Sequence, residues 1–340
     1  MAIHESTLLA PPMPQVPTPA PGQHVPTAHL EALAALRTRV EAALGPLGTE
    51  PGDFEECVEE LFRADAALQA YGPQRLELIE RYGGWGDDLE GRAFFFSIWR
   101  GFPFVSAPAR IAQRWHLIEP VLALAGRPIR VVDAEADVLG WAIAEACSLA
   151  ADGSAWVKSM VGAKAGIWRV PQWSSPADMP ADLGLALVHR EGDRDVFMVS
   201  PHVPMQHEYR IFVVDGSPVT GAGCIEEHTP LDRRDDDGAF VPLTRADRHA
   251  GAAEPPARRP ELVAELVEAS RPIAAALAEA GAAHCVVDMA MGPDGPVLVE
   301  VNGLENAGLY ATDVYAVARA MAASPSPQRL TAAGSAPWCV

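Results

Sequence analysis

Hydrophobic and polar positions follow two different rhythms along this chain. Near its start, apolar residues recur every three or four positions, as they do along one stripe of an amphipathic helix. This spacing predicts helices over about 28–44 and 53–72, the first with Thr27 as its N-cap. A third helix is expected from Pro73 to the Gly83–Gly84 pair.

Further along, the apolar runs are short and either continuous or alternating, which is typical of strands. The aromatic runs at 93–99 and 102–105 are expected to be buried strands. Helices are predicted over about 107–125, 136–150 and 260–280, and this mixture of elements indicates an α/β or α+β protein. The other strand patterns are IRVVDA (129–134), SAWVKSM (154–160), GIWRV (166–170), DVFMVSPHV (195–203), EYRIFVVDG (208–216), SPVTGAGCI (217–225) and HCVVDMAMGPDGPVLVEVN (284–302).

The same patterns divide the chain into four parts. Residues 1–26 are proline-rich and aperiodic and are expected to be a disordered tail, with a partner-docking motif as the alternative. Residues 27–106 read as a mostly helical region, 107–322 as the main domain and 323–340 as a flexible tail. Within the main domain, residues 226–260 are charged and rich in proline and glycine, which predicts a mobile loop, either a lid or a solvated linker.

Composition narrows the class of protein. With 340 residues, 49% hydrophobic and 21% charged, the chain has the content of an ordinary soluble globular protein. Its formal net charge of −19 repels nucleic acid and anionic lipid, so neither is an expected partner. Five scattered cysteines without a C-x-x-C spacing argue against a disulfide framework or a zinc site. No signal peptide and no membrane span are recognisable, so the expected compartment is the cytoplasm.

The last strand pattern places two carboxylates opposite one another. Its turn is expected near Asp294–Gly295, so residues whose numbers sum to about 588 or 589 should pair, as Asp288 and Glu300 do. Strand alternation puts Asn302 on the same face as Glu300. Opposed carboxylates repel unless a cation lies between them, and this set of oxygen ligands suits Mg²⁺. The alternative is a solvated pair of exposed carboxylates.

Three cations are candidates for binding phosphate near that metal. Lys158 ends a strand, and Lys164 lies in the small-residue loop after it, whose backbone N–H groups suit close approach to phosphates. Arg210 alternates with Glu208 on one face of a strand otherwise suited to burial. Such an arginine can neutralise a transferring phosphoryl group, or it can form a structural ion pair with Glu208.

The order of these motifs resembles that of the ATP-grasp superfamily over about residues 110–320. The resemblance is most specific in VVD…VLVEVN and next in EYRIFVVDG. It implies an α+β ATP-grasp fold, in which two α/β subdomains clasp ATP between antiparallel sheets behind a short, mostly helical N-terminal region. It further implies ATP and two Mg²⁺ ions as cofactors. The implied metal ligands are Asp288, Glu300 and Asn302, and the implied catalytic cations on the phosphates are Lys158 and Arg210.

The resemblance also assigns residues to the nucleotide, with two departures from the family pattern. Many members carry an earlier lysine where this chain has Arg110 or Arg114, and Arg114 is the favoured phosphate ligand. In the segment implied to be the adenine-binding hinge, Ser200 and His202 stand where an acidic or amide residue and an aromatic residue are common. The other implied ATP-binding residues are Lys158, Lys164, Pro201, Val203, Glu208 and Arg210.

By this resemblance the chain is an ATP-dependent ligase that joins a carboxylate to an amine through an acyl phosphate and releases ADP and phosphate. The expected partners are small-molecule or peptide carboxylates and amines, and a homodimer is the default assembly. In the loop after the metal-binding strand, Glu305, Asn306 and Tyr310 are expected to contact substrate, although packing of Tyr310 against the last helix is an equal alternative. Two other functions stay open: a phosphotransferase acting on a hydroxyl, and a non-catalytic nucleotide-binding interaction protein.

Overall fold

The structure of the protein is a computed structural model. Several predicted elements lie outside the residues it describes: the proline-rich tail up to residue 25, the third helix, the two aromatic strands and the C-terminal tail beyond residue 324. The described residues are 26–44, 54–72, 111–133, 136–160, 166–171, 183, 196–304 and 307–324.

The described residues alternate between helices and strands, and most follow the sequence prediction closely. Three short 3₁₀ helices, η1 (Trp115–Leu117), η3 (Pro230–Asp232) and η4 (Gly251–Ala253), join the longer elements. In chain order the helices and strands are α1 (Thr27–Leu44), α2 (Phe54–Tyr71), α6 (Glu119–Ala123), β1 (Arg130–Asp133), α7 (Ala136–Leu149), β2 (Ser154–Ser159), β3 (Ile167–Pro171), β4 (Val196–Pro201), β5 (Gln206–Val214), β6 (Ser217–Gly223), β7 (Leu243–Thr244), β8 (Ala257–Arg258), α9 (Pro260–Glu279), β9 (Cys285–Gly292), β10 (Gly295–Asn302) and α10 (Val314–Ala323).

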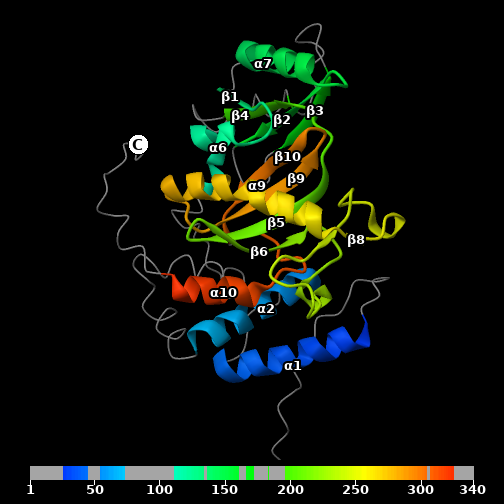
Figure 1. The fold of residues 1–340 in the computed structure, drawn as a ribbon, viewed down its shortest axis with the longest axis vertical. Coiled ribbons are helices and arrows are strands. Elements are labelled where there is room, and N and C mark those ends of the chain that lie inside the picture. The colour runs from blue at the N-terminus through cyan, green and yellow to red at the C-terminus, as the bar shows by residue number, and fades with distance from the viewer. Residues whose placement is uncertain are drawn as a thin grey trace, which may run out of the picture.

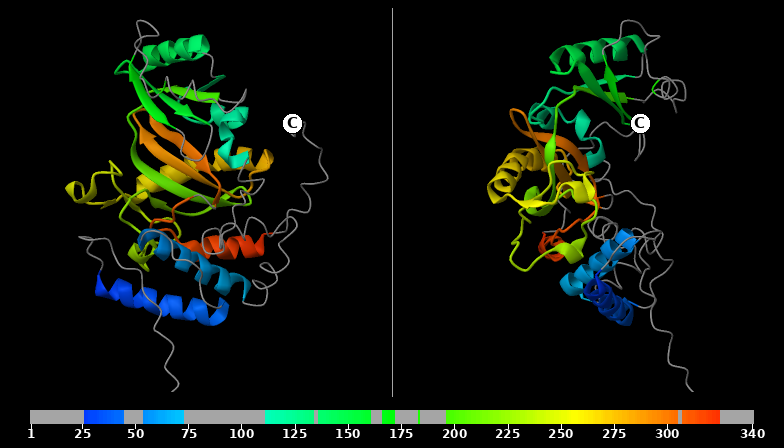
Figure 2. Two further views of the ribbon diagram at one scale, coloured as in Figure 1. Left: turned by 180° about the vertical axis from the view of Figure 1, so that it is seen from behind. Right: turned by 90° about the vertical axis from the view of Figure 1, so that its right-hand side faces the viewer.

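Two antiparallel four-stranded sheets form the centre of the molecule. Sheet A has the strand order β1-β4-β2-β3, and sheet B has the order β10-β9-β5-β6. Figure 1 shows α7 over sheet A at one end, sheet B with α9 across it in the middle, and α10, α2 and α1 at the other end. The two turned views keep the same order of layers (Figure 2). The antiparallel α+β architecture expected from the sequence is therefore present.

Sheet B is covered on both faces because its central strand is buried on both sides. Along β5, Tyr209 and Ile211 pack into the cluster under α9, which includes Leu277. Phe212 and Val214 point the other way, into the cluster formed with α2 and α10. A central strand covered on both faces reads as a continuous apolar run, as IFVV does here.

The two N-terminal helices are tied to the main domain by one buried carboxylate. Asp65 of α2 is fully buried and accepts hydrogen bonds from Arg39 of α1 at 2.7 and 2.9 Å, from Gln69 at 2.8 Å and from Tyr315 of α10 at 2.7 Å. A buried carboxylate with this many donors is satisfied. The N-terminal helical region is thus packed against α10 and sheet B rather than separate from them.

The continuous helix expected over 107–125 is wrong. From residue 111 the chain makes one helical turn, then η1, then the short helix α6. Pro120 sits in the first turn of α6. Proline fits there because it lacks an N–H, but the same ring ends any helix that arrives from the N-terminal side.

The charged segment 226–260 has short elements of its own. It contains η3, η4 and the two-stranded β7–β8 sheet. Thr229 and Asp232 form a capping box at η3. Arg245 donates to Glu227 at 2.8 Å. Within the described part of the chain, no helix has the length and apolar character needed to cross a membrane.

We expect the core between α9 and sheet B to dominate stability. Replacing the fully buried Leu277 with alanine should lower the free energy of unfolding by about 2–5 kcal/mol, because it removes apolar contacts and leaves a cavity. Leu149→Ala, at a position 60% exposed, is the matched control and should change it by no more than about 0.5 kcal/mol. Urea unfolding followed by circular dichroism measures both, and equal losses would contradict this assignment of the core.

Candidate functional site

A β-bulge in the last hairpin brings Asp288 and Glu300 face to face. The turn consists of Pro293 and Asp294, so Gly295 pairs with Gly292, and the register near the turn is one residue off the predicted one. A shift between Leu298 and Glu300 then restores the predicted pair, Glu300 opposite Asp288. The prediction of this pair is confirmed, although its turn was placed about half a residue too far along.

Arg210 binds Asp288 through two parallel hydrogen bonds. It lies opposite Asp288 on the neighbouring strand, and its Nε and Nη2 atoms donate to the two carboxylate oxygens at 2.8 and 2.6 Å. Both side chains are buried, at 8% and 0% exposure. Burial opposes the charged guanidinium, but the Asp288 carboxylate outweighs it and raises the pKa of Arg210.

The alternative that Arg210 pairs with Glu208 is wrong. Glu208 instead accepts a hydrogen bond from Arg248 at 2.8 Å. Burial and the nearby Asp288 charge raise the pKa of Glu208, while Arg248 opposes them. Arg248 comes from the segment 226–260, so this segment contributes a cation to the site that the sequence did not reveal.

Lys158 of sheet A reaches Glu300 of sheet B. Its Nζ donates to Glu300 Oε2 at 2.8 Å, and the Asn302 amide donates to Oε1 at 2.9 Å. Burial raises the pKa of Glu300, but Lys158 and Asn302 together hold it below its usual value. The predicted set Lys158, Glu300 and Asn302 is therefore brought together.

Lysine is rare enough in this chain for its position to matter. Of the 26 basic residues 24 are arginine, and the two lysines are Lys158 and Lys164, both at the end of β2 or just after it. Lysine is a compact point charge that binds single oxygens, whereas arginine favours planar, bidentate partners. Lys164 itself lies outside the described residues, as do Arg110, Glu305 and Asn306.

The predicted hinge joins the two sheets and is held by an arginine that the sequence did not point to. Arg127 donates to Ser200 Oγ at 2.6 Å and to the carbonyls of Leu298 and Val299 at 3.1 and 3.3 Å, so it links sheet A to sheet B. Burial lowers its pKa to about 10. Its one visible sequence signal is its place between a glycine and a proline at a strand entry. The preceding Gly126, at φ +69°, is also required, since a Cβ there would lie 2.4 Å from the Pro296 carbonyl oxygen.

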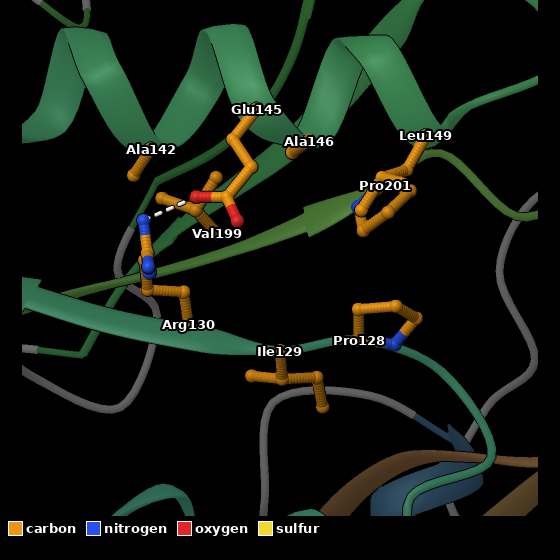
Figure 3. Close-up of a pocket in the computed structure, with 9 residues that line it drawn as sticks. All are labelled: Pro128, Ile129, Arg130, Ala142, Glu145, Ala146, Leu149, Val199 and Pro201. Carbon is orange, nitrogen blue, oxygen red and sulfur yellow. Dashed lines mark hydrogen bonds and ion pairs between the residues drawn. The ribbon is translucent and has the colours of Figure 1, made fainter.

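The rest of the hinge is bonded to the outer end of sheet A. His202 Nδ1 lies 2.5 Å from Asp152 Oδ2, and its backbone N–H donates to the Ser154 carbonyl at 2.9 Å. Hydrogen bonds from Ser154 are the largest cause of a low pKa at Asp152. Pro201 lines a pocket between α7, β1 and β4, beside the Arg130–Glu145 ion pair (Figure 3). Neither Lys158 nor Glu300 lines this pocket, so it is separate from the cluster of site charges.

Tyr310 covers Arg210 from the loop after β10. The Arg210 guanidinium carbon lies 5.0 Å from the centre of the Tyr310 ring, and Arg210 Nη1 donates to the Gly308 carbonyl at 3.1 Å. Arg248 donates to the Tyr310 hydroxyl at 3.2 Å. Of the predicted substrate residues, Tyr310 is thus the one placed at the site, and its ring contacts an arginine of the site.

The site also includes residues from the N-terminal region that sequence reasoning missed. Glu59 of α2 accepts a hydrogen bond from the Leu309 N–H at 2.5 Å, and Arg63 donates to the Ala307 carbonyl at 2.6 Å. These contacts join positions 250 and 244 residues apart, and no spacing rule reaches that far.

His116 is a second buried group that was not predicted. It is 3% exposed, and its Nδ1 has no hydrogen-bond partner among the described residues. Burial, followed by the charges of Arg114 and Lys158, lowers the pKa of His116 to about 4. The predicted phosphate ligand Arg114 therefore lies near enough to His116 to act on it, as Lys158 does.

The donor set fits Mg²⁺ in its chemistry, although the two carboxylates are not equally open. Glu300 is 30% exposed, whereas both oxygens of the buried Asp288 are taken by Arg210. Among the described residues, no three or more His, Cys, Asp or Glu side chains gather to hold a metal ion. Such a sparse set suits an ion that keeps water and takes its remaining ligands from phosphate.

Two antiparallel sheets joined by a short hinge, with a lysine of one facing a carboxylate of the other, define an ATP-grasp protein. A family model described as an ATP-grasp domain, the third family of its clade, matches residues 133–321. The chain belongs to this family, and the predicted ATP-grasp fold is confirmed.

Curated proteins give no match to the chain. Among solved structures, D-cycloserine synthetase DcsG shares 17% identity over 63% of this chain and 70% of its own, with a TM-score of 0.42. The D-alanine–D-alanine ligase of Bacillus anthracis complexed with ATP shares 14% over 81% and 95%, with a TM-score of 0.41. The RiPP-associated ATP-grasp ligase of Chryseobacterium gregarium, in complex with ADP and a leader and core peptide, shares 12% over 64% and 62%, with a TM-score of 0.36.

The Arg210–Asp288 pair should show strong energetic coupling. Arg210→Met leaves a buried carboxylate without its cation and should lower the free energy of unfolding by about 3–5 kcal/mol. Adding Asp288→Asn removes that charge, so the double variant should recover at least about 1 kcal/mol relative to the sum of the single losses. Urea unfolding of all four proteins measures the cycle, and additive losses would show that the pair is not formed.

His116 should make the protein less stable in mild acid. Its folded pKa, about 4, lies below its ordinary value of 6.5, so between these values the unfolded chain binds the extra proton. Stability then rises with pH across that window, with a contribution of up to about 1.4 kcal/mol per pH unit from this one group.

His116→Phe should remove that contribution and flatten the dependence on pH. His249→Gln, which removes an imidazole that is 66% exposed, is the control. Unfolding free energies measured at intervals between about pH 4.5 and 6.5 test it. An unchanged slope in His116→Phe would rule out a buried neutral imidazole.

Proposed function

We propose that the protein is an ATP-dependent ligase that joins a carboxylate to an amine through an acyl phosphate, with release of ADP and phosphate. The observation that carries the proposal is the meeting of Lys158, Glu300 and Asn302 with the Arg210–Asp288 pair, in a chain of the ATP-grasp family. Carboxylates and cations of this kind suit a metal-bound polyphosphate.

The residues of this chain supply charge and position in the proposed reaction. Lys158 would hold a phosphate of the nucleotide, and Arg210 would neutralise charge on the phosphoryl group in transfer. Arg114 and the hinge residues Ser200 to Val203 would bind the rest of ATP. Tyr310, which already lies over Arg210, would close the side from which the amine arrives.

Glu300, Asn302 and Asp288 would hold Mg²⁺, with Arg210 yielding its place on Asp288. When bound, the ion supplies Lewis-acid stabilisation of the β- and γ-phosphate oxygens. We place the reaction in a reducing cytoplasm, because Cys57, Cys147, Cys224 and Cys285 are free and buried.

A hydroxylamine trap tests the proposed reaction. The full chain is incubated with ATP, Mg²⁺, hydroxylamine and a panel of amino acids, peptides and other carboxylates, and both ADP and hydroxamate are measured. A ligase yields the two in equal amounts with its own carboxylate, because hydroxylamine attacks the acyl phosphate, and chelation of Mg²⁺ stops both. ADP with a stable phosphoester and no hydroxamate would identify a phosphotransferase. Nucleotide binding without ADP would identify a non-catalytic protein.

The site residues are tested in the same assay. Glu300→Gln and Lys158→Met should each lower ADP release by about 100-fold or more, because each removes a charge set to act on the phosphates. Glu265→Gln, an exposed change of the same kind on α9, is the control and should leave the rate unchanged. Full activity in Glu300→Gln would exclude this carboxylate from the reaction.

A further inference from the structure

Helix α2 grips the loop that carries Tyr310. Glu59 and Arg63 lie one helical turn apart, and both bind the main chain of residues 307–310, one through an N–H and the other through a carbonyl. Arg63 also lies 3.6 Å from Glu59, so the two side chains act as a pair. Their side chains are 18% and 4% exposed, which leaves little water to weaken these contacts.

The loop needs such a grip because Tyr310 has a strained backbone. Its φ is +49°, in the left-handed region that non-glycine residues seldom adopt. A residue held there costs about 1–3 kcal/mol and stays only where its surroundings fix it. Here the neighbouring Leu309 is bonded to Glu59, and the Tyr310 hydroxyl is bonded to Arg248.

Gly308 connects this grip to the reactive end of the site. A Cβ at Gly308 would lie 3.4 Å from both Arg210 Nη1 and Glu59 Oε1, so the loop backbone is sandwiched between the two charges. Arg210 holds the Gly308 carbonyl and also holds Asp288. A continuous polar path therefore runs from a predicted metal ligand, through Arg210 and the loop, to α2.

The charge of Glu59 belongs to this path. Burial raises its pKa, whereas Arg63, the N–H groups of Leu309 and Tyr310, and Arg210 all act to lower it. Every one of these groups favours the carboxylate over the neutral acid. The backbone amides alone would accept a neutral oxygen, so a glutamine at this position should serve in part.

From this geometry we infer that Glu59 is a positioning residue of the site: with Arg63 it holds residues 307–310 so that Tyr310 stays over Arg210. The N-terminal helices are then a part of the acceptor side of the site. The effect on catalysis rests on the proposed function, whereas the grip on the loop does not.

Hydrogen–deuterium exchange of the full chain without nucleotide tests the grip. In Glu59→Ala the peptide covering 307–312 should exchange about tenfold faster, because a charge-assisted hydrogen bond no longer opposes local opening. Glu59→Gln should fall between Glu59→Ala and the native protein. Peptides of β9 and β10 should be unchanged, and so should all peptides in Glu31→Gln, an exposed change of the same kind on α1.

Two results would overturn the inference. One is native exchange of 307–312 in Glu59→Ala or, if that variant does not fold, in Glu59→Gln. The other is equal acceleration in β9 and β10, which would mean that Glu59 supports the whole fold and not the loop. Neither result depends on whether the protein is a ligase.

A kinetic measurement then separates positioning from simple support of the fold. In the hydroxamate assay, Glu59→Gln should raise the KM for hydroxylamine by about fivefold or more and leave the KM for Mg·ATP within about twofold, because the loop lies on the acceptor side. Equal changes in both constants would contradict a role on that side. If no carboxylate gives hydroxamate at all, the proposed function fails and the exchange result still decides the grip.

Discussion

The ion pair between Arg210 and Asp288 is the interaction on which the candidate site depends. Its two parallel hydrogen bonds are made inside sheet B, away from water, where removing either partner leaves an unpaired buried charge. Arg210 also holds the Gly308 carbonyl and lies under the Tyr310 ring. The position of one guanidinium therefore fixes a strand pair, a loop and the wall of the site together.

What the sequence could predict was local. Asp288 and Glu300 lie on the two strands of one hairpin, so their pairing follows from a turn a few residues away. The bulge near Val299 was not predicted, yet it decides the outcome. Without it Glu300 would pair with Val287, and the strand alternation would turn its carboxylate to the opposite face. The expected pair was correct because a half-residue error in the turn and an unseen bulge compensate.

What the sequence could not predict was long-range. Glu208 and Arg210 alternate along one strand, so each was an available partner for the other, but each has its partner on another element. The grip of α2 on the loop joins residues some 250 positions apart. The role of Arg127 follows from no pattern either, since a buried arginine that binds a hydroxyl and two carbonyls leaves no spacing along the chain.

Charge balance explains how so many carboxylates can gather in a chain of net charge −19. Glu208, Asp288 and Glu300 each have one cation, namely Arg248, Arg210 and Lys158. Under the proposed function, an incoming polyphosphate and its divalent ion bring charges of both signs. Lys158 and Arg210 can then exchange carboxylate for phosphate while the carboxylates turn to the ion, and no buried charge is left without a partner at either stage. Arg248 has no such exchange available, because Glu208 lies off the hairpin that carries the metal ligands. Its part is instead to hold Tyr310, which makes the segment 226–260 a fixed wall of the site.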